Sequence, residues 1–165
     1  MKKLLFLLVA VIFVACSGKS ENELKGELNN LLKDKKYKEA EKTFETFISE
    51  YPESKSSDSL IFEFAKLYHS RVMTNLSSDQ NLKNAIKYYE KLYTEYPKSA
   101  NSPHAIFMCA FIYANELKDL NKAKDLYNKF LSQYPNHELA ASAKIELDNL
   151  GVPPADILKK FDGSK

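Results

Sequence analysis

The stretch LKNAIKYYEKLYTEYP (residues 82–97) decides the fold, because two other stretches of the chain repeat its pattern. They are YKEAEKTFETFISEYP (37–52) and LNKAKDLYNKFLSQYP (120–135), and the three align over sixteen residues without a gap. Each copy has alanine at its fourth position, an aromatic residue at its eighth, a large apolar residue at its eleventh and Tyr-Pro at its end. Repetition of this kind is typical of chains built from stacked units.

The shared positions predict three amphipathic helices. Offsets of four and three residues, as in Ala85, Tyr89 and Leu92, put side chains on one face of a helix. Alanine allows another helix to cross closely, and the rings fill the groove beside it. The proline ends each helix, because the residue before a proline disfavours the α conformation. The chain has only four glycines in 165 residues, which also favours an all-α fold with few tight turns.

A second kind of helix is predicted ahead of two of the copies. LIFEFAKLYHS (60–70) and AIFMCAFIYAN (105–115) each carry alanine followed three residues later by tyrosine. Together with the repeated stretches, they resemble the tetratricopeptide repeat, whose second helix carries Ala-x₃-Phe and ends at proline. The resemblance implies an all-α solenoid of about three helix-turn-helix repeats over residues 23–150. It also implies a C-terminal capping helix in HELAASAKIELDNLG (137–151), followed by a short helix or tail over 151–165.

The first residues of the chain indicate export and lipid attachment. Lys2 and Lys3 precede twelve apolar residues that lead into Cys16, which is the layout of a signal peptide. Twelve residues fall short of the roughly 20 that a helix needs to cross a bilayer. FVAC (13–16) resembles the lipobox of bacterial lipoproteins; the alternative is an ordinary secretory signal with an incidental cysteine. We expect residues 1–15 to be removed, Cys16 to carry the lipid and residues 16–22 to form a polar linker.

The net charge of the mature chain and the residue after Cys16 indicate where the protein is located. Without Lys2 and Lys3, 22 of the 24 basic residues remain against 22 acidic ones, so nucleic-acid binding is disfavoured and membrane attachment depends on the lipid. Ser17 after the cysteine favours the outer membrane in enterobacterial-type sorting, so we expect a lipid-anchored protein that faces the periplasm.

Neighbouring alanines of the repeats lie 45 and 38 residues apart, against about 34 in the family. The excess lies in HSRVMTNLSSDQN (69–81), which predicts either a longer first helix or a protruding loop.

In the tetratricopeptide family, the first helices of the repeats line a concave groove that binds proteins or peptides. The resemblance implies the following groove positions: Phe62, Lys66, His69 and Ser70; His104, Phe107, Phe111, Ala114 and Asn115; and Lys25, Asn29 and Lys33 in the first repeat. Aromatic side chains exposed together usually mark a binding site, so the three phenylalanines predict a contact surface. The alternative is that PPADILKKF (153–161) folds back and covers them.

The sequence carries no catalytic or cofactor signature. His69, His104 and His137 share no metal-ligand spacing, and a zinc site would need ligands from separate helices, so we expect neither metal nor cofactor. The glycines do not cluster into a phosphate loop, and Gly-x-Ser-x-Gly is absent. Cys109 stands alone in an apolar helical stretch, which predicts a small buried hydrophobe rather than a nucleophile. We therefore expect a protein that is not an enzyme.

The expected function is that of an envelope lipoprotein acting as a protein–protein interaction scaffold. Long repeats with Tyr-Pro ends and a lipobox are loosely similar to the outer-membrane protein assembly lipoprotein and to the Tol-Pal system coordinator family. The resemblance implies a role in outer-membrane protein assembly or envelope maintenance, as a monomer or as part of a complex with other envelope proteins or peptides. The alternative is a carrier that holds an extended peptide or a glycan in the groove.

Overall fold

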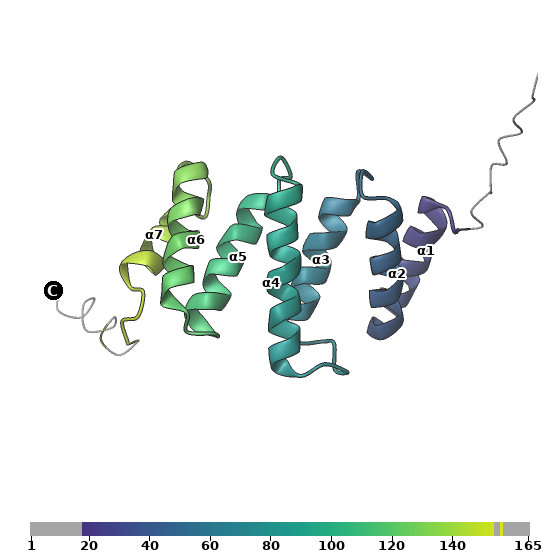
Figure 1. The fold of residues 1–165 in the computed structure, drawn as a ribbon, viewed down its shortest axis with the longest axis horizontal. Coiled ribbons are helices and arrows are strands. Elements are labelled where there is room, and N and C mark those ends of the chain that lie inside the picture. The colour runs from purple at the N-terminus through teal and green to yellow at the C-terminus, as the bar shows by residue number, and fades with distance from the viewer. Residues whose placement is uncertain (1–17, 154–155, 157–165) are drawn as a thin grey trace, which may run out of the picture.

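A computed structural model describes residues 18–153 and residue 156, and the regular structure in these residues is entirely helical. Its α-helices are α1 (Glu21–Lys33), α2 (Tyr37–Glu50), α3 (Ser57–His69), α4 (Ser78–Glu95), α5 (Ser102–Asn115), α6 (Leu120–Gln133) and α7 (Ala140–Asp148). They follow one another in a row from α1 at one end to α7 at the other (Figure 1). Each helix packs mainly against its neighbours in the sequence, which is how a solenoid is built. The predicted all-α repeat fold is confirmed.

Some of the sequence predictions concern residues that the structure does not describe. Cys16, the signal peptide and most of the C-terminal tail lie outside the described residues. So does most of the stretch that was considered as a cover for the groove. None of the described helices is long and apolar enough to cross a membrane.

The three repeated stretches form α2, α4 and α6, and each helix ends directly before its Tyr-Pro pair. The predicted face is buried in every copy. Its fully buried members are Ala40, Phe44 and Phe47 in α2; Ala85, Tyr89 and Leu92 in α4; and Ala123, Tyr127 and Phe130 in α6. The register predicted from the sequence is therefore confirmed.

In each of the first two repeats, a serine two residues after the Tyr-Pro pair forms a hydrogen bond with the first helix of the same repeat. Ser54 Oγ donates to a carboxylate oxygen of Glu21 at 2.7 Å, and Ser99 Oγ donates to Asp58 at 2.6 Å. The third copy has His137 where the first two have this serine. One turn of the solenoid therefore carries an imidazole at a position that elsewhere carries a small hydroxyl.

The long segment between α3 and α4 is a loop over residues 70–77, so the helix-extension alternative is wrong. Met73 in this loop is fully buried, and Asn81 at the start of α4 is 2% exposed. The Asn81 side-chain amide donates to the carbonyl oxygens of Met73, Leu76 and Ser77 at 3.1, 3.3 and 3.1 Å. A buried carbonyl without a partner is costly, so Asn81 stabilises the loop by pairing its backbone.

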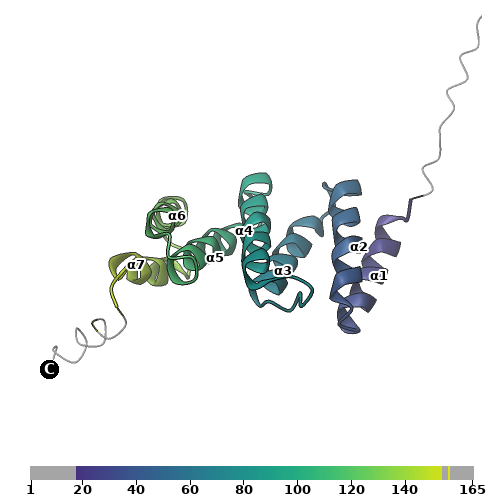
Figure 2. The same cartoon turned by 60° about the horizontal axis from the view of Figure 1, so that its bottom comes forward.

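The capping helix predicted near the C-terminus is α7, which lies beside α6 at the end of the row (Figure 2). After α7 the chain turns back toward the start of α6 through Gly151, whose φ is +79°. A Cβ atom at this position would lie 2.9 Å from Cδ1 of Leu120. The left-handed backbone favours glycine here, and a larger residue would also require the Leu120 side chain to shift.

Candidate binding surface

The residues predicted for the groove lie mainly on α3 and α5, and they fall into groups with different contacts. In the first group, the half-buried ring of Phe62 lies 5.9 Å from the ring of Tyr89 and 6.1 Å from that of His104, measured between centroids. Lys66 Nζ lies 5.4 Å from the centroid of the Phe62 ring and 2.6 Å from a carboxylate oxygen of Glu63. Phe62, Lys66 and His104 thus combine aromatic, cationic and imidazole groups in one region.

The second group is His69 and Phe111, whose ring centroids are 6.5 Å apart. His69 Nε2 also lies 2.7 Å from Oε1 of Glu116, and the other oxygen of Glu116 pairs with Arg71. Burial alone would raise the pKa of Glu116, but the hydrogen bonds from Arg71 and His69 and the charge of Arg71 outweigh it and hold the pKa below its ordinary value. His69 therefore ties the end of α3 to the end of α5 in the free protein.

The three phenylalanines of the predicted surface differ in what they contact. Phe107 packs edge-on against the buried rings of Tyr127 and Phe130 on α6, at 5.8 and 6.1 Å, and so extends the core. Among the described residues, the ring of Phe111 pairs with that of His69 alone. Phe111 therefore contributes least to the packing of the core and is the strongest candidate for a contact with a partner.

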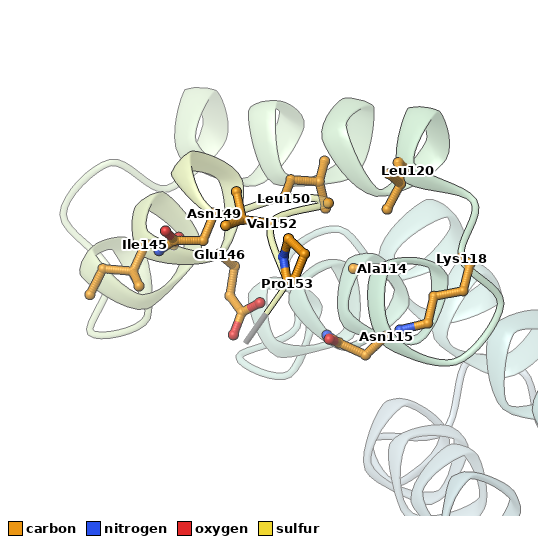
Figure 3. Close-up of a pocket in the computed structure, with 11 residues that line it drawn as sticks. Ala114, Asn115, Lys118, Leu120, Ile145, Glu146, Asn149, Leu150, Val152 and Pro153 are labelled. Carbon is orange, nitrogen blue, oxygen red and sulfur yellow. The ribbon is translucent and has the colours of Figure 1, made fainter. Parts of the chain in front are cut away.

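Ala114 and Asn115, also predicted for the groove, open onto a pocket of about 550 Å³ at the C-terminal end of the row. Figure 3 shows Leu120 of α6 and Asn115 at the end of α5 on one side of Pro153, and Ile145 of α7 on the other side with its side chain directed outward. The walls are apolar at Leu120, Ile145 and Pro153, and polar groups of α5 and α7 form the rim. The pocket thus offers an apolar floor within reach of hydrogen-bonding side chains.

The sequence did not indicate this pocket. Leu120 occupies the first position of a repeated stretch, and the equivalent Leu82 is 4% exposed, yet Leu120 is 39% exposed and Ile145 59%. The difference arises because Leu120 lies at the end of the solenoid, where no further described helix covers it. The exposed large apolar side chains of the described residues are Leu117, Leu120 and Ile145, all at this end. Such a cluster usually marks an interaction site.

The remaining predicted positions form a smaller and more polar surface. Lys25 and Asn29 of α1 line a hollow of about 200 Å³ together with Lys55 and Ser59. Lys33 and Ser70 are exposed near the ends of α1 and α3. These positions of α1 and α3 therefore add amino, amide and hydroxyl groups to the surface, in contrast to the apolar side chains at the other end of the row.

Cys109 is buried, as predicted, and burial raises the pKa of its thiol well above the ordinary value. A protonated, buried thiol does not act as a nucleophile. The structure does, however, bring His104 beside the adjacent residues His137 and Glu138, to which its spacing in the sequence does not connect it. The one signal that could have indicated this pairing is the histidine that replaces serine after the third Tyr-Pro pair.

A family model described as a tetratricopeptide repeat matches the chain over residues 24–54, 65–99 and 104–137. The first and third matches cover most of α1 with α2 and most of α5 with α6, and the second runs from within α3 into the turn after α4. No curated protein matches the chain. The matched segments coincide with the helix pairs that the repeated stretches predicted.

Proposed function

The chain belongs to the tetratricopeptide repeat family, and from this premise we propose that it is a non-catalytic scaffold that binds a protein partner across α3, α5 and the pocket beside α7. Repeats of this family imply protein–protein interaction in general. The observation that carries the proposal is the apolar pocket at the end of the row, where Leu120 and Ile145 are exposed. Burial of such side chains against a partner stabilises a complex.

Phe111 connects this pocket to the rest of the proposed surface. Asn115 lies one turn after Phe111 on α5, and its side-chain amide donates to the Phe111 carbonyl at 3.2 Å. An extended partner segment that crosses α5 would therefore contact the Phe111 ring and insert its next apolar side chain into this pocket beside Leu120. The half-buried Phe62 on α3 would contact the same segment further along.

We assign this scaffold to the bacterial envelope, with the lipid on Cys16 anchoring it to the outer membrane and the repeats facing the periplasm. The support is FVAC at residues 13–16, the apolar run before it and Ser17 after it. The loose similarity to the outer-membrane protein assembly lipoprotein and to the Tol-Pal coordinator family supports a role in outer-membrane protein assembly or envelope maintenance. The partners would then be other envelope proteins or their peptide segments.

A carrier for an extended peptide or a glycan is the second candidate function. The group of Phe62, Lys66 and His104 favours it, because a half-buried ring lies beside an ammonium and an imidazole. Such a group can bind a small polar ligand without a large interface. Capture from cross-linked envelopes separates the two functions: a protein recovered in stoichiometric amount supports the scaffold, and its absence supports the carrier.

The binding surface is tested by replacing Phe111 with alanine and measuring both affinity and melting temperature. A phenylalanine fully buried at an interface contributes about 1.5–3 kcal/mol, so Phe111→Ala should weaken capture of the partner roughly tenfold or more. Its melting temperature should stay close to that of the wild type. Phe44→Ala is the core control, because truncation of a fully buried phenylalanine costs about 3–5 kcal/mol of stability. If Phe111→Ala unfolds as early as Phe44→Ala, the ring is structural and the proposed surface is wrong.

The anchor is tested with Cys16→Ser followed by membrane fractionation. Two or more acyl chains hold a protein on a membrane, and the rest of the proposal supplies no other attachment. The variant should therefore appear either as an unprocessed precursor or as a soluble protein. Mass spectrometry that finds an unmodified mature N-terminus at another residue would overturn the lipoprotein assignment.

A further inference from the structure

Two histidines and a glutamate meet where α5 begins and where the chain turns from α6 to α7. His104 lies in the first turn of α5, and His137 and Glu138 lie in the turn before α7. The ring centroids of His104 and His137 are 5.0 Å apart, and Nε2 of His104 lies 3.4 Å from Oε1 of Glu138. One nitrogen of each ring and a carboxylate oxygen all lie within 4.8 Å of one another.

These separations are close to those of a zinc site. With Zn–N and Zn–O bonds of about 2.0–2.2 Å, neighbouring donors in a tetrahedral site lie about 3.3–3.5 Å apart. The His104–Glu138 separation already has this value. The Glu138 side chain is 76% exposed, so it can rotate to bring its carboxylate closer to the His137 ring nitrogen.

The hydrogen bonds of the two rings identify the nitrogen that each could offer. In the first two repeats, Ser54 and Ser99 accept a bond from the backbone amide two residues later, at 3.1 Å in both cases. His137 Nδ1 accepts the equivalent bond from the Leu139 amide at 3.2 Å. His104 Nδ1 is buried, with no hydrogen-bond partner among the described residues. Nε2 is therefore the nitrogen that each ring could turn to a ligand, although on His137 it carries the ring proton as long as Nδ1 accepts this bond.

We propose that His104, His137 and Glu138 bind a divalent transition metal such as Zn²⁺, with a fourth position open to water. Two imidazoles and one carboxylate are a donor set that zinc uses in sites with an open position. Zinc binding at Nε2 of His137 moves the ring proton to Nδ1, so the bond from the Leu139 amide is lost when the metal binds. The loss of this bond lowers the affinity of the site for zinc. It also means that the Leu139 amide signal reports binding of the metal to His137. The site does not depend on the proposed scaffold function.

The test uses purified protein without a histidine tag, titrated with zinc chloride at neutral pH by calorimetry and by thermal melting. We expect binding of one zinc ion per chain and a rise in melting temperature. His137→Ser restores the residue that the other repeats carry and keeps an acceptor for the Leu139 amide, so the variant should fold while its zinc affinity falls roughly tenfold or more. His104→Ala and Glu138→Gln should lower the affinity as well.

His69→Ala is the matched control, because His69 pairs with Glu116 and takes no part in the proposed site. Its zinc affinity should equal that of the wild type. In nuclear magnetic resonance spectra of the wild type, the Leu139 amide signal should shift on addition of zinc, and in His137→Ser it should not. Absence of zinc binding by the wild type, or an equal loss of affinity in His69→Ala and His137→Ser, would overturn the proposal.

Discussion

The connection from α3 to α4 (70–77) and the connection from α5 to α6 (116–119) join helices of the same two kinds, yet one is much longer than the other. The short connection is held locally: Asp119 accepts a bond from the Lys122 amide at 3.1 Å and so caps α6. The long one needs a buried side chain, Asn81, to pair its carbonyl groups. A repeat can therefore lengthen without losing its packing when a side chain from the next helix satisfies the added backbone.

The two connections are also joined to each other. Glu116, at the start of the short connection, contacts both His69 and Arg71 at the start of the long one. Each connection contains a basic residue with positive φ, Arg71 at 56° and Lys118 at 58°. Arg71 is held by Ser78 as well as by Glu116, whereas no hydrogen bond or ion pair within the described part of the chain holds the side chain of Lys118. The residue with positive φ is thus fixed by side-chain bonds in the long connection and not in the short one.

The largest expected effect tests the close helix packing at a buried alanine that the second and third repeats share. Ala85 and Ala123 are both fully buried, so Ala85→Leu and Ala123→Leu should each lower the free energy of unfolding by up to about 3 kcal/mol through overpacking. Lys87→Leu, at an exposed position of the same helix as Ala85, should change it by less than about 0.5 kcal/mol. Urea unfolding followed by circular dichroism measures all three. Equal tolerance of leucine at positions 85 and 87 would contradict the packing described.

The next effect compares how much one side chain stabilises each of the two connections. Asn81→Leu removes a donor from the carbonyl groups of Met73, Leu76 and Ser77, of which only those of Met73 and Ser77 keep a bond from a backbone amide among the described residues. The change should therefore cost about 2 kcal/mol and speed hydrogen exchange over residues 70–77. The matched change in the short connection, Asp119→Ala, removes a helix cap and should cost about 1 kcal/mol. If the loop keeps its protection in Asn81→Leu, Met73 alone anchors it and the comparison must be revised.

The helices were predictable from the sequence and the contacts between distant residues were not. Alanine and aromatic spacing and the Tyr-Pro pairs are local signals, so they predicted the repeated helices and their ends. Asn81 is a polar residue next to a polar loop, and only the fold shows that it is buried. The contact of Glu116 with His69 depends on how successive repeats stack, and that of His104 with His137 depends on how the two helices of one repeat pack. No spacing along the chain encodes this packing, and the same holds for the exposure of Leu120.

A smaller effect tests the link through Glu116. Its pKa is lowered in the folded protein, so its stabilisation is present above the ordinary value of 4.5 and is lost as the pH falls through the folded-state pKa. Glu116→Gln should reduce the free energy of unfolding by about 1 kcal/mol at neutral pH, since the pair is partly exposed. The difference between wild type and variant should shrink in acid. A difference that stays constant from neutral pH into acid would show that the carboxylate charge contributes nothing.

The smallest effect concerns the backbone of the short connection. Lys118 has left-handed φ, which costs an ordinary residue about 1–2 kcal/mol and costs glycine nothing. Glycine also gives the unfolded chain more freedom, which offsets about 0.4–1 kcal/mol, so Lys118→Gly should stabilise the protein by roughly 0.5 kcal/mol. Arg71→Gly relieves the same backbone strain but removes the bonds to Ser78 and Glu116, so it should bring no gain. Chemical denaturation of both variants decides between them. Equal stabilisation by the two changes would mean that Arg71, like Lys118, contributes nothing through its side chain.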